Sequence, residues 1–389
     1  MNPMQLEEKY GANNYQPLPV VLTRGKGIYC WDDSGKKYID MLSAYSALNH
    51  GHCHPRLVDV FTKQARTLTL TSRAFYNEHL GRFLEQACQL TGFARALPMN
   101  TGAEAVETAI KAARKWAYTV KEVPLHAAEI IVCENNFHGR TTTIISMSTE
   151  PQYRNGFGPY TPGFKVIPYN DPEALRKAIN ANTAAFLVEP IQGESGVHIP
   201  TPGYLKQCSE LCQEHNVLFF ADEIQTGLGR TGKILAVHHE KVQPDGIMLG
   251  KALGGGLLPV SLFLARDDVM DVFTPGDHGS TFGGNPLAAE VGLEALAVLV
   301  EEGLVENSAR LGDYFLRRLR EFSSPLIKEI RGKGLFIGVE IDIARISARD
   351  ACLKLLHAGI LSKDTHNTVI RFAPPLVITE AEIDEAIEK

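Results

Sequence analysis

LFFADE (218–223) and MLGKALGGG (248–256) are two apolar runs, and each leads to an ionisable side chain, Asp222 in the first and Lys251 in the second. Short runs that are almost continuously apolar are typical of strands buried on both faces of a parallel sheet. We therefore expect two strands of an α/β domain, with an acid and an amine at neighbouring strand ends.

This pairing of Asp222 with Lys251 provides the two groups that pyridoxal phosphate chemistry requires. The lysine forms a Schiff base with the cofactor aldehyde, and the acid keeps the pyridine nitrogen protonated so that the ring acts as an electron sink. A lysine in a glycine-rich turn is by itself usually a solvated residue, so the hypothesis depends on the two residues together.

Further apolar runs alternate with helical patterns, which indicates an α/β domain built on a mostly parallel sheet. The expected strands are EIIVCE (129–134), KVIPY (165–169), AAFLVEP (184–190), VLFFAD (217–222), DGIMLG (245–250) and VSLFLA (260–265). Residues 251–260 are too few for a helical crossover between the last two. We expect that pair to be antiparallel, with Lys251 in the turn.

The stretch 103–118 has a helical pattern that begins just after Thr101 and Gly102. Its apolar face consists of Val106, Ala109, Ile110, Ala113 and Ala117. A helix that opens at Thr-Gly-Ala offers free backbone N–H groups and a hydroxyl to an anion, which favours a phosphate site. Ordinary helix capping is the alternative explanation of the Thr-Gly pair.

Asn285 and Pro286 have the pattern of a helix N-cap and a first-turn proline, and Gly303 should end that helix. Beyond this hinge the expected helices are about 304–322, 348–358 and 379–388, and the expected strands are 335–341 and 369–374. We expect an N-terminal segment (1–40), a large domain (41–285) and a smaller α+β C-terminal domain (286–389).

Composition limits the class of protein further. The 389 residues, 44% of them hydrophobic, are enough for two domains with a substantial core. A formal charge of −6 and a pI near 6.1 provide no basic surface for nucleic acid, and no run approaches the roughly 18 apolar residues of a membrane span. With no signal or transit pattern and no CxxC pair among seven cysteines, we expect a cytoplasmic protein with reduced thiols.

Eight stretches, in order along nearly the whole chain, resemble the class III pyridoxal phosphate aminotransferases. They are 14–55, MNTGAEAVETAIKAARKW (99–116), FHGRT (137–141), EPIQGESGV (189–197), ADEIQTGLGRTG (221–232), LGKALGGGLLPVS (249–261), HGSTFGGNPL (278–287) and VIRFAPPLVI (369–378). The resemblance implies the fold-type-I architecture, with a mostly parallel seven-stranded sheet flanked by helices and a smaller α+β C-terminal domain. It also implies a homodimer with active sites at the subunit interface.

The resemblance implies a cofactor role for each matching residue. Lys251 would be the Schiff-base lysine and the base that moves the proton, Asp222 would pair with the pyridinium nitrogen, and Gln225 would reach the phenolic oxygen. The other implied cofactor contacts are Phe137, which would stack on the ring, its neighbour His138, and the phosphate-site residues Thr101, Gly102, Ala103 and, from the second subunit, Ser280 and Thr281.

The family match also implies how substrates bind, and it is most similar to the ornithine-converting members. Tyr15, Tyr45 and Arg140 match positions at the far end of the site, where the α-amino and α-carboxylate groups of ornithine would lie. Arg371 would bind the α-carboxylate of 2-oxoglutarate, and Glu194 would neutralise Arg371 while ornithine is bound. An unpaired buried arginine would attract the amino acid's own carboxylate and invert the regiochemistry.

The implied reaction transfers the δ-amino group of ornithine to 2-oxoglutarate by a ping-pong route. Its products are glutamate and glutamate 5-semialdehyde, which cyclises to pyrroline-5-carboxylate. N-acetylornithine and 4-aminobutyrate are alternative substrates, and Tyr45 should discriminate among them because a free α-amino group benefits from a hydroxyl partner. A catalytically silent paralogue is the alternative from another class of protein.

Three further details bear on the site. His50 stands where the family has an uncharged amide, and Ala103 replaces a common valine. The stretch GHCHP (51–55) contains two histidines, but with no acidic or cysteine cluster nearby we interpret it as a structural turn and expect no metal.

Overall fold

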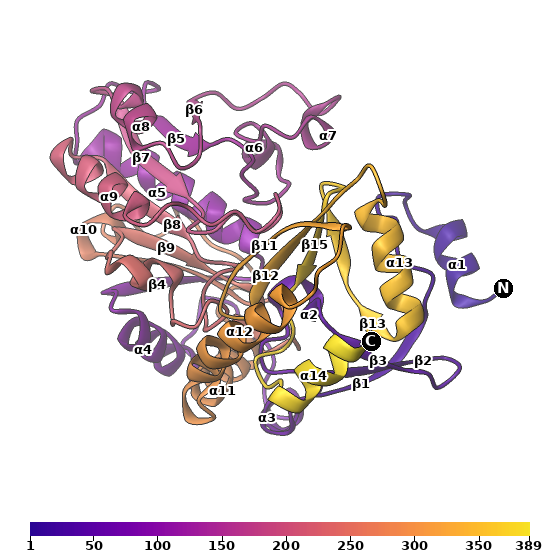
Figure 1. The fold of residues 1–389 in the computed structure, drawn as a ribbon. Helices are drawn as coiled ribbons and strands as arrows, with labels where there is room; N and C mark the ends of the chain where they lie inside the picture. Colours follow the sequence, from indigo (N-terminus) through magenta and orange to yellow (C-terminus); the bar gives the residue numbers. More distant parts are fainter.

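The computed structural model describes residues 1–389, and its central feature is a seven-stranded sheet of order β4-β10-β9-β8-β7-β5-β6 (Figure 1). The strands are β4 (Arg95–Met99), β5 (Glu129–Cys133), β6 (Phe164–Ile167), β7 (Thr183–Val188), β8 (Leu218–Asp222), β9 (Gly246–Leu249) and β10 (Ser261–Ala265). The expected strands are all present. Strand β4 was not among the expected strands. It contains Pro98, a residue tolerated here because β4 is an edge strand that pairs with β10 alone.

Strands β5 to β9 pair in parallel, whereas β10 is antiparallel to both β9 and β4. The short turn predicted after β9 is confirmed, and it includes the 3-10 segment η2 (Lys251–Gly254). Because parallel strands end at one edge of a sheet, the loops after β5, β7, β8 and β9 meet at the carboxyl edge. This edge places Asp222 and Lys251 close together.

Side chains of the central strands alternate between two cores, as expected of a sheet covered on both faces. Ile131, Phe219 and Ile247 belong to the larger core with helices α9 (Tyr204–Glu214) and α11 (Pro286–Glu301). Phe220 and Met248 belong to the second core with α5 (Gly102–Thr119). The remaining helical segments of this part are α2 (Ser43–Ser46), α3 (Pro55–Ala65), α4 (Leu80–Thr91), α6 (Thr142–Ile145), α7 (Pro151–Arg154), α8 (Pro172–Ala178), η1 (Ala236–Glu240) and α10 (Asp267–Met270).

A second sheet, of order β11-β12-β15-β14, follows α11 in the chain. The Asn285 side chain accepts from the Ala288 N–H, and Pro286 occupies the first turn, so the predicted helix start is confirmed. The elements after α11 are α12 (Leu304–Arg320), β11 (Ile327–Lys333), β12 (Phe336–Ile341), α13 (Ala348–Ala358), β13 (Ile360–Leu361), β14 (Lys363–Thr365), β15 (Val369–Phe372) and α14 (Glu380–Glu388).

The N-terminal segment joins this C-terminal part through a third sheet, of order β1-β2-β3-β13. Its N-terminal strands are β1 (Leu22–Lys26), β2 (Tyr29–Asp32) and β3 (Lys37–Asp40), and α1 (Pro3–Tyr10) precedes them at the periphery in Figure 1.

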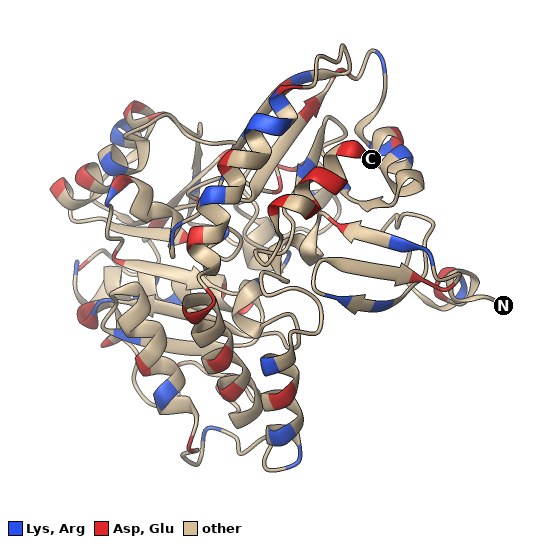
Figure 2. Ribbon diagram, turned by 60° about the horizontal axis from the view of Figure 1, so that its bottom comes forward, with Lys and Arg blue, Asp and Glu red and all other residues tan.

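Acidic and basic residues lie interspersed along most helices (Figure 2). None of the helices combines the length and apolar character that a membrane crossing requires.

Candidate active site

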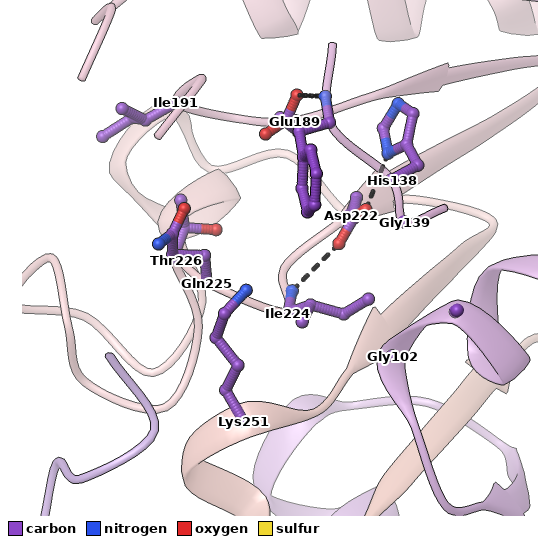
Figure 3. Close-up of a pocket in the computed structure, with 12 residues that line it drawn as sticks. Gly102, His138, Gly139, Glu189, Ile191, Asp222, Ile224, Gln225, Thr226 and Lys251 are labelled. Atoms are coloured by element: carbon purple, nitrogen blue, oxygen red, sulfur yellow. Dashed lines mark hydrogen bonds and ion pairs between the residues drawn. The ribbon is translucent and has the colours of Figure 1, made fainter. Parts of the chain in front are cut away.

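A cavity of about 240 Å³ lies at the carboxyl edge of the seven-stranded sheet (Figure 3). Its walls come from the loops after four neighbouring strands and from the first turn of α5. They include Phe137 after β5, Glu189 after β7, Asp222 at the end of β8, Lys251 after β9, and Gly102 at the start of α5. Four of these residues were predicted to lie together, and the structure brings them together.

Lys251 begins the turn after β9 and extends into this cavity (Figure 3). Burial lowers the pKa of its ammonium group, although the nearby carboxylates of Glu194 and Asp222 oppose the shift. A lowered pKa increases the fraction of neutral amine, which is the form that attacks a carbonyl carbon. The cavity thus contains one activated primary amine.

Asp222 is held by two donors. Its Oδ2 lies 2.7 Å from Nδ1 of His138, and its Oδ1 accepts from the Ile224 N–H at 3.1 Å. Burial disfavours a charged His138, but the hydrogen bond to Asp222 outweighs burial and raises the pKa of His138. The imidazole therefore lies behind the carboxylate as a donor that fixes its orientation.

The first turn of α5 offers backbone N–H groups to the cavity through Gly102 and Ala103. Thr101 forms a capping box with Glu104, because its Oγ1 accepts from the Glu104 N–H and the Glu104 carboxylate accepts from the Thr101 N–H. Thr101 therefore does cap the helix, which was the alternative explanation. The backbone N–H groups of the next two residues, Gly102 and Ala103, are still available to bind an anion. Gly139 has φ +126°, and a Cβ there would lie 3.1 Å from the Ala103 Cβ.

Glu189 was not singled out from the sequence, although its strand-end position in EPIQGES was visible. Its Oε2 accepts from the Phe137 N–H at 2.9 Å, which holds the Phe137 loop against the cavity. Burial raises the pKa of Glu189 to about 8, even though His138 nearby opposes the shift. The Glu189 side chain therefore lines the cavity as a neutral, protonated carboxyl group near neutral pH.

Glu189→Gln should flatten the pH dependence of stability in the cofactor-free protein. A raised folded-state pKa means that the native state binds more protons than the unfolded state between about pH 4.5 and 8, so this group reduces stability as pH rises through that window. The substitution should reduce the slope of the free energy of unfolding against pH by at most about 1.4 kcal/mol per pH unit. Urea unfolding at several pH values measures it, and parallel wild-type and variant curves would contradict the assignment.

Arg371 on β15 reaches the cavity region from the smaller sheet and pairs with Glu194. Its Nη1 lies 2.7 Å from Glu194 Oε1, and only 1% of the arginine is exposed. Burial alone would raise the pKa of Glu194, because it disfavours the charged carboxylate. The positive charge of Arg371 has the larger effect, and the pKa of Glu194 is lowered. Gln225 Nε2 also donates to Glu194 Oε1, at 3.2 Å. The structure thus contains the ion pair between Glu194 and Arg371 that the predicted gate requires.

Gly193 leaves no room for a side chain beside this ion pair, because a Cβ there would lie 2.7 Å from Cζ of the buried Phe336 ring, as well as 2.0 Å from Gln225 Oε1. Gln225 was expected to reach a cofactor oxygen. It lines the cavity, and its Nε2 also donates to the backbone carbonyl of Tyr45 at 3.3 Å. It therefore connects the cavity to the Glu194 and Tyr45 side of the site.

Arg140 forms a second cationic group at the outer part of the site. Its guanidinium carbon lies 4.7 Å from the ring centre of Tyr153, 5.5 Å from that of Phe137 and 6.0 Å from that of Tyr15. The predicted Arg140–Tyr15 proximity is present, and Tyr15 is 58% exposed. Tyr153 was missed, because nothing in its local sequence shows that α7 folds back onto Arg140.

Tyr45 lies in an unusual backbone turn with its ring 5.5 Å from the Arg371 guanidinium carbon. The four residues Ser43, Ala44, Tyr45 and Ser46 all have positive φ, between 47° and 71°. The left-handed backbone conformation costs each residue that has a Cβ about 1–2 kcal/mol. Even glycine normally adopts this conformation at single positions and not in runs. Four such residues in succession need support from the surrounding structure.

GHCHP (51–55) does lie near an acidic group and a cysteine in space, so that part of the sequence interpretation is wrong. His52 Nε2 is 2.7 Å from Asp40 Oδ2 and 3.2 Å from Cys30 Sγ, and these groups form the one His/Cys/Asp cluster of possible metal ligands. His50 differs: burial lowers its pKa to about 4, and its Nε2 donates to the Ala295 carbonyl at 2.9 Å. The neutral imidazole therefore serves as a hydrogen-bond donor at the position where the sequence analysis expected an amide.

Ser280 and Thr281 do not line this chain's own cavity. Ser280 Oγ accepts from Asn100 Nδ2 at 2.7 Å, and Thr281 is exposed. Within one chain, therefore, neither of these two predicted phosphate-site residues reaches the cavity: Ser280 is half-buried against Asn100, and Thr281 is exposed.

Comparison with known proteins places this fold and site in one class. The family Aminotransferase class-III matches residues 10–389. The chain is 59% identical over 386 residues to an ornithine aminotransferase of Geobacillus sp. (strain WCH70), covering 99% of this chain and 96% of that protein. The chain therefore belongs to the class-III aminotransferases, with their fold-type-I architecture, and it is a pyridoxal-phosphate-dependent transaminase.

Two solved structures are similar to it throughout. An ornithine aminotransferase from Toxoplasma gondii, described with partial occupancy of pyridoxal phosphate at its active site, has a TM-score of 0.97 and 51% identity, covering 99% of this chain and 92% of that chain. An acetylornithine aminotransferase from Elizabethkingia anophelis has a TM-score of 0.90 and 52% identity, with coverages of 99% and 96%.

The residues of the cavity fit that cofactor. A phosphate suits the N–H groups of Gly102 and Ala103, an aldehyde suits the Lys251 amine, and a pyridine N–H suits the oriented Asp222 carboxylate. The close approach of Gly139 to Ala103 keeps the backbone tight around the anion seat.

Proposed function

We propose that this chain transfers the δ-amino group of ornithine to 2-oxoglutarate, giving glutamate and glutamate 5-semialdehyde, which cyclises to pyrroline-5-carboxylate. The Glu194–Arg371 pair beside Tyr45 carries this proposal. The names of two relatives, the 59% identical Geobacillus protein and the 51% identical Toxoplasma gondii protein, support it. Steady-state formation of pyrroline-5-carboxylate from ornithine and 2-oxoglutarate tests it directly.

When bound, pyridoxal phosphate supplies an aldehyde that accepts the amino group and a ring that delocalises negative charge from the reacting carbon. Lys251 supplies the amine that anchors the group and the base that moves a proton at the substrate carbon. Asp222, oriented by His138, would provide the negative charge that pairs with the protonated ring nitrogen of the cofactor. Phe137, whose backbone is held by Glu189, lines the cavity and would cover one face of the cofactor ring.

The arrangement of charges accounts for the choice of the δ-amino group. Arg371 is the buried cation of the gate, and while Glu194 neutralises it an amino acid's α-carboxylate gains nothing by binding there. Arg140, near Tyr15, provides a separate cation for the α-carboxylate at the outer end. Ornithine then extends with its δ-amino group toward Lys251. With 2-oxoglutarate, Glu194 moves away and Arg371 binds the keto acid.

Tyr45→Phe should raise the KM for ornithine selectively, by about tenfold, because it removes a hydroxyl partner of the free α-amino group. Burial raises the pKa of Tyr45, so the phenol keeps its proton and remains a neutral partner. Initial rates with ornithine and with 4-aminobutyrate measure the effect. Equal changes for both substrates would contradict the role assigned to Tyr45.

N-acetylornithine or 4-aminobutyrate is the alternative substrate, and the 52% identity to an acetylornithine aminotransferase is the observation that favours the first. An N-acetylated α-amino group needs no hydroxyl donor or acceptor of the Tyr45 type. The same rate comparison therefore separates the candidates.

The proposal includes a homodimer in a cytoplasmic setting. Phe75, Tyr76 and Phe282 are large apolar side chains that are 70%, 104% and 55% exposed. Asn77 Nδ2 donates to the Gly284 carbonyl at 3.3 Å, which joins the two exposed segments. A second copy covering this surface would bury it and bring Ser280 and Thr281 toward the other cavity.

A further inference from the structure

The left-handed turn Ser43–Ser46 is fixed at its first residues by Asp40. The carboxylate oxygen Oδ1 of Asp40 accepts from the Leu42 N–H at 2.9 Å and from the Ser43 N–H at 2.8 Å. Asp40 is 5% exposed, so little water competes for these bonds. One oxygen of the carboxylate thus holds the entry to the turn, and the other oxygen is free for a different partner.

That partner is His52, whose Nε2 lies 2.7 Å from Asp40 Oδ2. Its backbone is held from both sides, because the His52 N–H donates to the Gly27 carbonyl at 2.8 Å and the Gly27 N–H donates to the His52 carbonyl at 3.0 Å. Its ring lies against Gly25, where a Cβ would lie 2.8 Å from ring atoms. The imidazole therefore has little freedom to turn away from Asp40.

The charge state of His52 strengthens this contact. Burial disfavours the imidazolium, but hydrogen bonds to Asp40 and Cys30 outweigh it and raise the pKa of His52 to about 10. A protonated ring donates a charge-assisted bond to the carboxylate. A zinc ion in a tetrahedral site holds nitrogen and oxygen ligands roughly 3.3 Å apart. The observed 2.7 Å is a hydrogen-bond distance, so in this structure the His52 ring and the Asp40 carboxylate are in direct contact.

The other end of the turn reaches the substrate site. The Tyr45 carbonyl accepts from Gln225, and the Tyr45 ring lies beside the Arg371 guanidinium. After the turn, Leu48 packs against the glycine run that follows Lys251, since a Cβ at Gly256 would lie 2.3 Å from Leu48 Cδ2. The turn therefore connects the Asp40 carboxylate at one end to the Tyr45 side of the substrate site at the other.

We propose that His52, acting through Asp40, is a positioning residue for substrate selection: the His52–Asp40 clamp holds the left-handed turn that presents Tyr45 to the substrate. This rests on the proposed function, because it assigns His52 to the same selection step as Tyr45. Asp40 and His52 touch no substrate, and their effect passes through the backbone of residues 42–46.

His52→Leu should lower kcat/KM for ornithine by about tenfold to 100-fold, the usual cost of misplacing a binding group. It should change kcat/KM for 4-aminobutyrate much less, since that substrate has no α-amino group for Tyr45 to meet. His52→Gln keeps an N–H donor near the Nε2 position and should restore most of the preference. His54→Leu is the matched control, because His54 pairs with Glu302 at 3.2 Å and does not contact the clamp.

A double-mutant cycle tests whether His52 acts through Tyr45. In His52→Leu/Tyr45→Phe the loss of ornithine preference should be no greater than in the worse single variant, whereas full additivity would overturn the proposal. Should His52→Leu fail to fold, Asp40→Asn retains an Oδ1 acceptor for the turn and loses the acceptor for His52. That variant should show the same selective loss, and an unchanged ornithine preference would overturn the proposal.

Hydrogen exchange provides a readout that does not depend on substrate. In the holoenzyme, the amides of Leu42 and Ser43 should lose protection in His52→Leu and keep it in His54→Leu. If wild-type protein prefers ornithine while both protection and preference survive in His52→Leu, the clamp is wrong and the proposed function stands. If wild-type protein shows no ornithine preference, the proposed function fails, and loss of amide protection alone still reports on the clamp.

Discussion

Replacing Lys251 with alanine should lower the turnover of ornithine by at least about 10⁴-fold, because one side chain is assigned both the covalent anchor and the proton-moving base. No other lysine lines the cavity, so no neighbouring amine takes over either role. The same variant should lose the visible absorbance band of the lysine-bound cofactor. Steady-state rates and an absorbance spectrum of purified holoenzyme measure both effects.

Lys233→Ala is the matched control for that experiment, since Lys233 is an exposed lysine outside the cavity. It should keep both the band and the rate. A Lys251→Ala protein that retained turnover within tenfold of wild type, or that kept the band, would show that another group anchors the cofactor.

Glu194→Ala should change which amino group of ornithine reacts. Arg371 is 1% exposed, and Glu194 is its only ion-pair partner. The Nε of Arg371 has no hydrogen-bond partner in the chain. Without Glu194 this buried cation attracts the ornithine α-carboxylate, which brings the α-amino group to the reacting position. We expect kcat/KM for pyrroline-5-carboxylate formation to fall by about 100-fold, which corresponds to roughly 2.7 kcal/mol.

Analysis of the keto products from ornithine measures this redirection. The α-keto product should appear in Glu194→Ala, while the half-reaction with 2-oxoglutarate should remain as fast as in wild type or become faster. Glu210→Ala, which removes an exposed glutamate paired only with Lys206, is the control. Pyrroline-5-carboxylate as the sole product at wild-type efficiency would contradict the gate.

Much of the large domain could be predicted from the sequence because its strands are buried on both faces. Runs such as LFFAD (218–222) are almost continuously apolar, and their ends mark the sheet edge that holds Asp222 and Lys251. The antiparallel turn after β9 followed from chain length alone. Strand β11, with sequence IKEIRGK, is polar and partly exposed, so its pairing depends on a neighbour and not on its own pattern.

The parts of the site that were missed depend on contacts between distant segments. Tyr153 reaches Arg140 only because α7 folds back, and Cys30 and Asp40 reach His52 only because the third sheet forms. The four left-handed residues, Ser43 to Ser46, include no glycine. The sequence therefore contains no residue type that would predict this turn. Family resemblance supplied residue roles, whereas the support behind those residues required the structure.

The measurement that tests the central assignment most directly is a single-turnover absorbance scan of the purified holoenzyme with ornithine, N-acetylornithine and 4-aminobutyrate in separate reactions. We predict that the band of the lysine-bound cofactor converts to the amino form of the cofactor much faster with ornithine than with the other two. Faster conversion with N-acetylornithine or 4-aminobutyrate would contradict the assignment of Tyr45 and the Glu194–Arg371 gate, and the absence of any such band would contradict the role of Lys251.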